Sequence, residues 1–152
     1  MPAGRRRSQA KAKRFKMISN EKKQELADLA VEMRKRSYIP YSHYAVGAAL
    51  LTKSGKIFTG CNIENAAYPV TICAERTAIF KAVSEGEKEF EAIAIATEDG
   101  LGYPCGSCRQ VMAEFALDMT VMLADREGHI TTEATVIELL PGAFTPNRLL
   151  DR

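Results

Sequence analysis

The first regular pattern along the chain is helical. Hydrophobic side chains recur at the spacing i, i+3, i+4, i+7, which places them on one face of an α-helix: Leu26, Leu29, Ala30 and Met33. Ser19 and Asn20 are both good N-caps, and Pro40 prevents a helix from continuing. The pattern therefore predicts one amphipathic helix from residue 19 or 20 to near Ser37.

Short apolar runs bounded by turn residues follow this helix and predict strands. Ser54 and Gly55 separate the first two runs and indicate an antiparallel hairpin, and the β-branched Ile93 and Ile95 mark a buried strand. The predicted strands are residues 46–52, 56–62, 90–97, 119–124 and 130–135.

Two more helices are predicted between these strands, at residues 73–84 and 105–116. Helices that alternate with strands imply a mixed sheet covered on both faces. We therefore expect an α/β fold, a three-layer α/β/α sandwich with a five-stranded mixed sheet, formed by residues 17–152 as one domain. The length of 152 residues suits a single globular domain.

The net charge of +2 hides an asymmetry. Residues 1–16 hold seven Lys or Arg and no acid, so the remainder has 14 basic and 19 acidic residues. An acidic body repels a phosphate backbone and argues against nucleic acid as a partner. We interpret residues 1–16 as a basic, disordered extension without a catalytic role; a nucleic-acid arm, a weak transit sequence and an extension upstream of Met17 are the alternatives.

Two further features favour a cytoplasmic protein. No apolar run approaches the roughly 20 residues that span a bilayer, and no apolar segment follows the basic start as it would in a secretory signal. The four cysteines are too sparse for a disulfide-linked secreted scaffold. We therefore expect no membrane partner.

Three cysteines lie where a metal ion could be held. Cys73 and Cys105 each open a predicted helix, and Cys108 shares a face with Cys105 because the two are three residues apart. Helix N-termini favour anions and lower the pKa of a thiol. Three thiolates on one Zn²⁺ leave a tetrahedral position open, which is typical of a catalytic site with bound water.

Glu75 is the candidate proton carrier. It is too close to Cys73 to be an easy fourth ligand, but it can take a proton from that water and pass it to a substrate. We interpret Cys61 as a small buried residue of a strand rather than the fourth ligand of a closed structural site. His43 and His129 have no ligand spacing.

An arginine stands beside each cysteine group, Arg76 after Cys73 and Arg109 after Cys108. Three thiolates around Zn²⁺ carry a net charge of −1, which neighbouring guanidinium groups would offset. The plainer interpretation is two surface charges.

Five runs of the sequence, in this order, resemble the small homotetrameric zinc-dependent cytidine deaminases: residues 40–50, 60–68, 73–78, 104–110 and 138–144. The match spans about residues 21–144 and includes the zinc deaminase signature of cysteine ligands, a nearby Glu and Pro-Cys-x-x-Cys. It implies hydrolytic deamination of cytidine and deoxycytidine to uridine and deoxyuridine in pyrimidine salvage. It also implies one Zn²⁺ per chain and a homotetramer whose sites neighbouring subunits complete.

The resemblance also implies roles for individual residues. Cys73, Cys105 and Cys108 would hold zinc, Glu75 would move protons as hydroxide attacks C4 of cytosine and ammonia leaves, and Arg76 would offset the thiolate charge.

The resemblance further implies a set of nucleoside contacts. Asn62 and Glu64 would bind the ribose 3′ hydroxyl, and the backbone of Ala74 would contact the base. Tyr44, in place of the family's usual Phe, and Phe144 would pack on the nucleoside, with Phe144 coming from a neighbouring subunit.

Three other interpretations stay open at this point. The chain could deaminate a cytosine-containing nucleoside analogue, or nucleic acid held by its basic extension. It could also be a binding module without enzymatic activity, in which zinc merely joins two helices.

Deleting residues 1–16 should leave activity and assembly unchanged, because none of the matching runs includes that segment. The measurement is kcat/KM on cytidine, with the full chain as the control. A tenfold fall, about 1.4 kcal/mol of transition-state stabilisation, would show that the extension takes part in the site.

Overall fold

A five-stranded mixed sheet organises the chain. The computed structural model describes residues 18–150, and the basic extension predicted at residues 1–16 lies outside them. The strand order is β2-β1-β3-β4-β5, with β3 and β4 parallel and all other neighbours antiparallel. The strands are β1 (Gly47–Thr52), β2 (Ile57–Cys61), β3 (Phe90–Ala96), β4 (Thr120–Ala124) and β5 (Ile130–Thr135).

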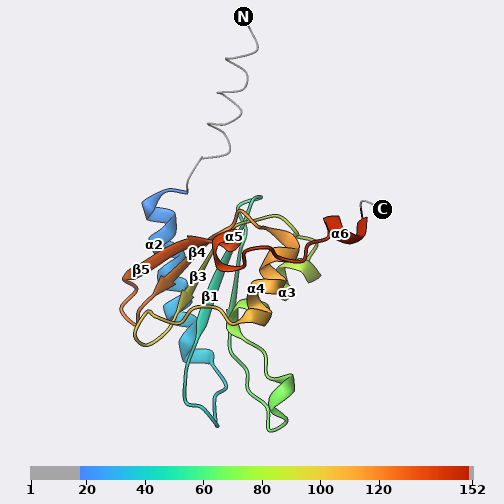
Figure 1. Ribbon diagram of the computed structural model, residues 1–152. Helices are drawn as coiled ribbons and strands as arrows, with labels where there is room; N and C mark the ends of the chain where they lie inside the picture. The colour runs from blue at the N-terminus through green and yellow to red at the C-terminus, as the bar shows by residue number, and fades with distance from the viewer. Residues whose placement is uncertain (1–17, 151–152) are drawn as a thin grey trace, which may run out of the picture.

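Helices cover both faces of this sheet (Figure 1). On one face lies α2 (Asn20–Met33), extended by the 3₁₀ turn η1 (Arg34–Arg36); on the other lie α3 (Ala74–Ser84), α4 (Gly106–Phe115) and the short α5 (Val136–Leu139). The turns η2 (Tyr68–Val70) and α6 (Asn147–Leu150) lie outside these layers. The predicted three-layer α/β/α sandwich is confirmed. Within residues 18–150, no helix combines the length and the apolar composition that crossing a bilayer requires.

Strand β1 shows how the two layers are built. Successive side chains of a strand point to opposite faces. Ala49 and Leu51 pack against α2, whereas Ala48 and Leu50 pack in the core under α3 and α4. A strand buried on both faces is therefore apolar throughout, as the sequence of β1 is.

The predicted element boundaries hold within a few residues. Cys73 and Cys105, predicted as the first residues of their helices, are the N-caps of α3 and α4. The sequence analysis missed α5, although its signal is present. Thr135 and Glu138 form a reciprocal capping box at its start.

The connections of β3 bring α3 and α4 together. Gly47, the first residue of β1, pairs with both Cys61 and Ala96, the last residues of β2 and β3. Strands β2 and β3 therefore terminate along the same edge of the sheet, the one formed by strand ends. Helix α3 begins at this edge, where Thr77 Oγ1 donates a hydrogen bond to the carbonyl oxygen of Cys61 (3.1 Å). Helix α4 follows β3 and leads to the parallel β4, as a crossover requires. Both helices therefore begin near the carboxyl end of β3.

The start of α3 lies very close to β2 at Gly60. A Cβ atom on residue 60 would lie 2.4 Å from the carbonyl oxygen of Ala74 and 2.7 Å from the backbone nitrogen of Ala78. Both atoms belong to helix backbone, so the helix itself would have to move.

The substitution Gly60→Ala should therefore lower the free energy of unfolding by about 1–3 kcal/mol, the cost of overpacking a core. The measurement is the midpoint of urea unfolding. Gly106→Ala is the matched control, because its new methyl group meets no atom within 4 Å. Equal midpoints for the two variants would contradict the close approach of α3 to β2.

Candidate functional site

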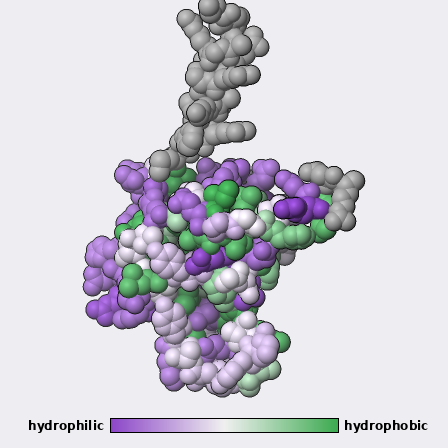
Figure 2. Space-filling view, in the orientation of Figure 1, coloured by the Kyte–Doolittle hydropathy of each residue, from purple (hydrophilic) through white to green (hydrophobic). Residues whose placement is uncertain are grey.

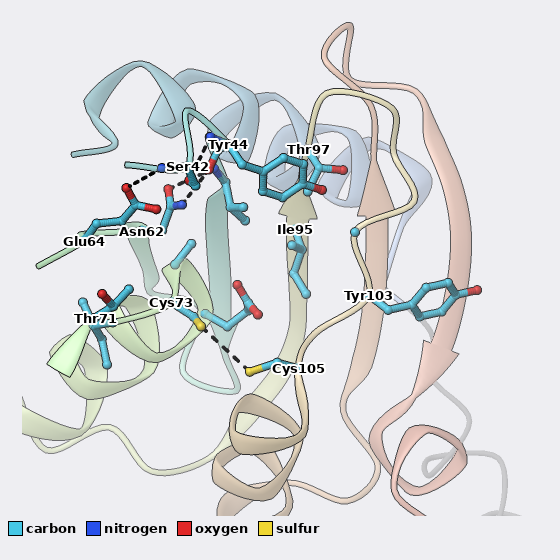
Figure 3. A pocket seen from close by; sticks show the side chains of 15 residues that line it. Ser42, Tyr44, Asn62, Glu64, Thr71, Cys73, Ile95, Thr97, Tyr103 and Cys105 are labelled. Carbon is cyan, nitrogen blue, oxygen red and sulfur yellow. Dashed lines mark hydrogen bonds between the residues drawn. The ribbon is translucent and has the colours of Figure 1, made fainter. Parts of the chain in front are cut away.

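Three sulfur atoms meet where α3 and α4 begin. The Sγ atoms of Cys73, Cys105 and Cys108 lie within 4.8 Å of one another, and those of Cys73 and Cys105 are 3.9 Å apart (Figure 3). A tetrahedral zinc ion with Zn–S bonds of about 2.3 Å separates its sulfurs by about 3.8 Å. The donor set therefore fits a thiophilic tetrahedral ion. In residues 18–150 no fourth His, Cys, Asp or Glu joins the cluster, which leaves one position for a small ligand.

Hydrogen bonds link the cysteine sulfurs to one another and to the guanidinium group of Arg76. Hydrogen bonds to the Cys73 sulfur lower the pKa of Cys73 to about 5; the bond from Cys108 has the larger effect and that from Arg76 the smaller. The Arg76 Nη2 to Cys73 Sγ distance is 3.3 Å. The same bond to Cys73, together with burial, raises the pKa of Cys108. The hydrogen bonds therefore favour the thiolate form of Cys73 over that of Cys108.

Glu75 lies in the first turn of α3 and is only 4% exposed. Burial raises the pKa of its carboxyl group, and the neighbouring Cys73 thiolate raises it further. A raised pKa brings a carboxyl group closer to the operating pH, which favours both uptake and release of a proton. Glu75 therefore has the environment of a proton carrier.

A cavity of about 300 Å³ opens beside the sulfurs and is the size of a small-molecule site. It is lined by residues from the segments before β1 and after β2, the start of α3, the end of β3 and the segment before α4 (Figure 3). The predicted site residues that line it are Tyr44, Asn62, Glu64, Cys73, Ala74, Glu75 and Cys105.

Sequence reasoning missed other lining residues, among them Ser42, Thr71 and Thr97. Thr97 directly follows β3, and the general tendency of ligands to bind at the carboxyl ends of strands in α/β sheets is the signal that would have found it. Tyr103 also lines the cavity, but its ring points away from the other labelled side chains (Figure 3).

Asn62 and Glu64, which lie in the segment after β2, both line the cavity. Asn62 Nδ2 donates to the carbonyl oxygen of Tyr44 (2.7 Å). Glu64 Oε1 accepts from the backbone N–H groups of Tyr41 (3.0 Å) and Ser42 (3.1 Å). Hydrogen bonds from the side chain and backbone of Ser42 lower the pKa of Glu64, so this carboxyl group stays ionised.

Phe144 does not line the cavity of its own chain. Its side chain is 59% exposed, and its carbonyl oxygen accepts a hydrogen bond from Gln110 Nε2 (2.8 Å). Arg109 makes two contacts that the sequence did not predict. Its guanidinium group donates to the carbonyl oxygens of Pro104 (2.7 Å) and Leu139 (2.8 Å) and so ties α5 to the segment before α4.

The remaining candidates lie outside the cluster. Cys61 is buried in β2, and its thiol contacts the carbonyl oxygen of Arg36 at 3.4 Å. Burial raises the pKa of this thiol, in keeping with a small buried residue. His43 and His129 do not join the metal-binding group, as expected from their spacing.

Comparisons with known proteins agree with this geometry. Residues 20–124 match the family model of the cytidine and deoxycytidylate deaminase zinc-binding region. The cytidine deaminase of Halalkalibacterium halodurans is 50% identical over 131 residues, which are 85% of this chain and 98% of that protein. That of Sporosarcina psychrophila is 53% identical over 118 residues, 76% and 86% of the two chains. The crystal structure of cytidine deaminase from Burkholderia pseudomallei matches with a TM-score of 0.76 at 43% identity, covering 84% of this chain and 100% of that one.

One zinc ion per chain is expected, held by the three clustered cysteines. Cys108→Ser should lower the zinc content well below one, because an alcohol is a far poorer ligand than a thiolate. Cys61→Ser is the matched control and should retain one zinc per chain. The measurement is elemental analysis of the folded proteins. Loss of zinc from folded Cys61→Ser protein would contradict the three-sulfur site.

Proposed function

This chain belongs to the cytidine and deoxycytidylate deaminase family and is an enzyme of that family; we propose that it hydrolyses cytidine and deoxycytidine to uridine and deoxyuridine in pyrimidine salvage. The observation that carries the proposal is the position of Glu75, a buried carboxyl group that lines a cavity of nucleoside size beside three clustered sulfurs.

The zinc dependence rests on the donor set. Cys73, Cys105 and Cys108 would hold the ion, since all three sulfurs lie within 4.8 Å of one another and the 3.9 Å between Cys73 and Cys105 matches tetrahedral zinc. When bound there, zinc supplies a Lewis acid that activates water at neutral pH. Arg76 would offset part of the thiolate charge through its contact with Cys73.

The two carboxyl groups of the cavity have different environments, and this difference supports different roles. Glu64 accepts hydrogen bonds and stays ionised, so it suits a hydroxyl donor. Glu75 is buried and has a raised pKa, so it suits proton transfer. In our proposal Glu75 accepts the proton of the attacking water and passes it to N3 of the cytosine ring; it then takes the proton of the new hydroxyl group on C4 and delivers it to the departing amine.

The sugar and base contacts follow from the same cavity. A carboxylate has about four acceptor positions. The backbone N–H groups of Tyr41 and Ser42 occupy only some of those of Glu64, so Glu64 can still accept a hydrogen bond from a ribose 3′ hydroxyl. Asn62 keeps one amide hydrogen for the same group, since Nδ2 makes a single bond to Tyr44. Ala74 at the start of α3 would contact the base through its backbone, and the ring of Tyr44 would pack on the nucleoside.

We also propose that the enzyme acts as a homotetramer in which Phe144 of one subunit packs on the nucleoside of another. Phe144 is exposed and does not line its own cavity, which supports this arrangement. Exposed tyrosines on the loops beside the cavity would lie in the subunit contacts: Tyr38, Tyr41 and Tyr68. Four free thiols are compatible with the reducing cytoplasm as its compartment.

The substitution Glu75→Gln tests the mechanism. Gln preserves the size of the side chain but cannot carry the proton. We expect normal zinc content, retained nucleoside binding, and a kcat on cytidine and deoxycytidine lower by roughly 10²-fold to 10⁴-fold. The measurement is a spectrophotometric assay of deamination.

Glu114→Gln is the matched control, because Glu114 is exposed on the neighbouring helix α4, and its kcat should equal that of the parent. Turnover by Glu75→Gln within a few-fold of the parent would exclude Glu75 as the proton carrier. It would also favour a purely structural metal site.

A further inference from the structure

The Tyr44 segment, residues 41–46, carries Tyr44 to the cavity without belonging to any helix or strand. His43 within it has a φ of 56°, in the left-handed region that residues with a Cβ atom rarely adopt. Such a conformation persists only where surrounding groups hold it. At the end nearest β1, Arg34 and Ser37 bind the carbonyl oxygens of residues 45 and 46.

The side chains of Asn62 and Glu64 hydrogen-bond to the backbone on both sides of Tyr44 (Figure 3), and the Tyr68 ring packs edge-on against Tyr41 at the start of the segment. Asn62 uses both ends of its amide. Nδ2 donates to the carbonyl oxygen of Tyr44 (2.7 Å), and Oδ1 accepts from the backbone N–H of Val46 (3.0 Å). Glu64 holds two consecutive backbone N–H groups earlier in the segment, at 3.0 and 3.1 Å. Together the two side chains bind four backbone groups.

The backbone that carries Asn62 and Glu64 is itself held by hydrogen bonds. Ile63, between them, exchanges two backbone hydrogen bonds with Ile72, each of 3.0 Å. On its other side, Tyr38 donates to the carbonyl oxygen of Asn62 (3.1 Å) and accepts from the N–H of Glu64 (2.8 Å). The loops before β1 and after β2 therefore run side by side at one end of the sheet (Figure 1) and form a lobe of mostly pale, intermediate hydropathy (Figure 2).

We infer that Asn62 and Glu64 are positioning residues for Tyr44, in addition to any contact that they make with a sugar hydroxyl. They fix the segment, and the segment sets where the Tyr44 ring lies, over the cavity in the direction of Thr97 (Figure 3). Sugar recognition and ring placement then depend on the same two side chains. Any effect of this dependence on deamination kinetics rests on the proposed function, whereas the positioning of Tyr44 itself can be tested without turnover.

Fluorescence gives the direct test, because the chain contains no tryptophan. Tyr44→Trp places a single reporter on the segment, and its time-resolved anisotropy measures local motion in the substrate-free protein. Adding Asn62→Asp keeps the side-chain size and the acceptor for Val46, but puts a carboxylate oxygen against the Tyr44 carbonyl. We expect a larger amplitude of local motion. Unchanged anisotropy would overturn the inference.

Glu64 supplies a matched pair of variants for the same measurement. Glu64→Gln keeps an oxygen acceptor for the two N–H groups and should leave the anisotropy of the Tyr44→Trp protein unchanged. Glu64→Met keeps the length but removes the acceptor, so it should increase the local motion. Because Glu64 lies on the surface rather than in the core, this pair remains informative if Asn62→Asp fails to fold. Equal anisotropy for Gln and Met would contradict the inference.

Kinetics separate positioning from sugar binding. Asn62→Asp also removes the amide hydrogen that Asn62 could give to a sugar hydroxyl, a contact that cytidine can make and 3′-deoxycytidine cannot. If Asn62 positions Tyr44, Asn62→Asp should lower kcat/KM by roughly tenfold or more on both cytidine and 3′-deoxycytidine. A role confined to the hydroxyl predicts a loss on cytidine alone and would overturn the inference.

A double-mutant cycle shows whether the effect passes through Tyr44. In a Tyr44→Ala background, Asn62→Asp should lose most of its effect on kcat/KM. Fully additive effects would argue against coupling. If the parent protein failed to deaminate cytidine, the proposed function would be wrong, and the anisotropy of the Tyr44→Trp variants would still decide the inference.

Discussion

Three ionisable sulfurs crowded within 4.8 Å of one another beside a buried carboxyl group form the arrangement on which the rest of the structure depends. Like charges this close repel strongly where water is excluded. The chain lowers that cost in two ways. Cys73 and Cys105 cap helices whose N-termini favour anions, and Arg76 donates to the Cys73 sulfur. A bound dication would remove most of the remaining repulsion, so metal binding should also stabilise the fold.

The distance between the sulfurs is set by packing some way from them. Helices α3 and α4 lie on the same face of the sheet, and α3 can approach β2 closely because residue 60 has no side chain and the facing residues Ala74 and Ala78 are small. The contacts of Arg109 with Pro104 and Leu139 hold the segment that leads into α4. A shift of either helix would open the cluster, so core packing and metal affinity are linked.

Local patterns predicted most of the fold and the three cysteines that cluster, whereas contacts distant in sequence could not be predicted. Long periodic segments and the spacing of Cys105 and Cys108 depend on neighbouring residues alone. A four-residue helix such as α5 has too little periodicity to stand out. The bond from Arg109 to Leu139 joins residues 30 apart, and the bonds of Asn62 depend on the path of a loop 16 to 18 residues away.

Burial, rather than helix position, sets the direction in which the pKa of Glu75 is shifted. A carboxylate in the first turn of a helix gains about 0.3–1 kcal/mol from the helix dipole, which favours ionisation. Complete burial can raise the pKa of a carboxyl group by up to about 3–5 units, which at 1.36 kcal/mol per unit is several times larger. The pKa of Glu75 is accordingly raised, with burial as the largest cause. Glu64 is the same residue type on an exposed loop, where hydrogen bonds lower its pKa. The fold thus places two glutamates of one cavity in different environments, which suits Glu75 to the proposed proton transfer and Glu64 to the proposed hydroxyl binding.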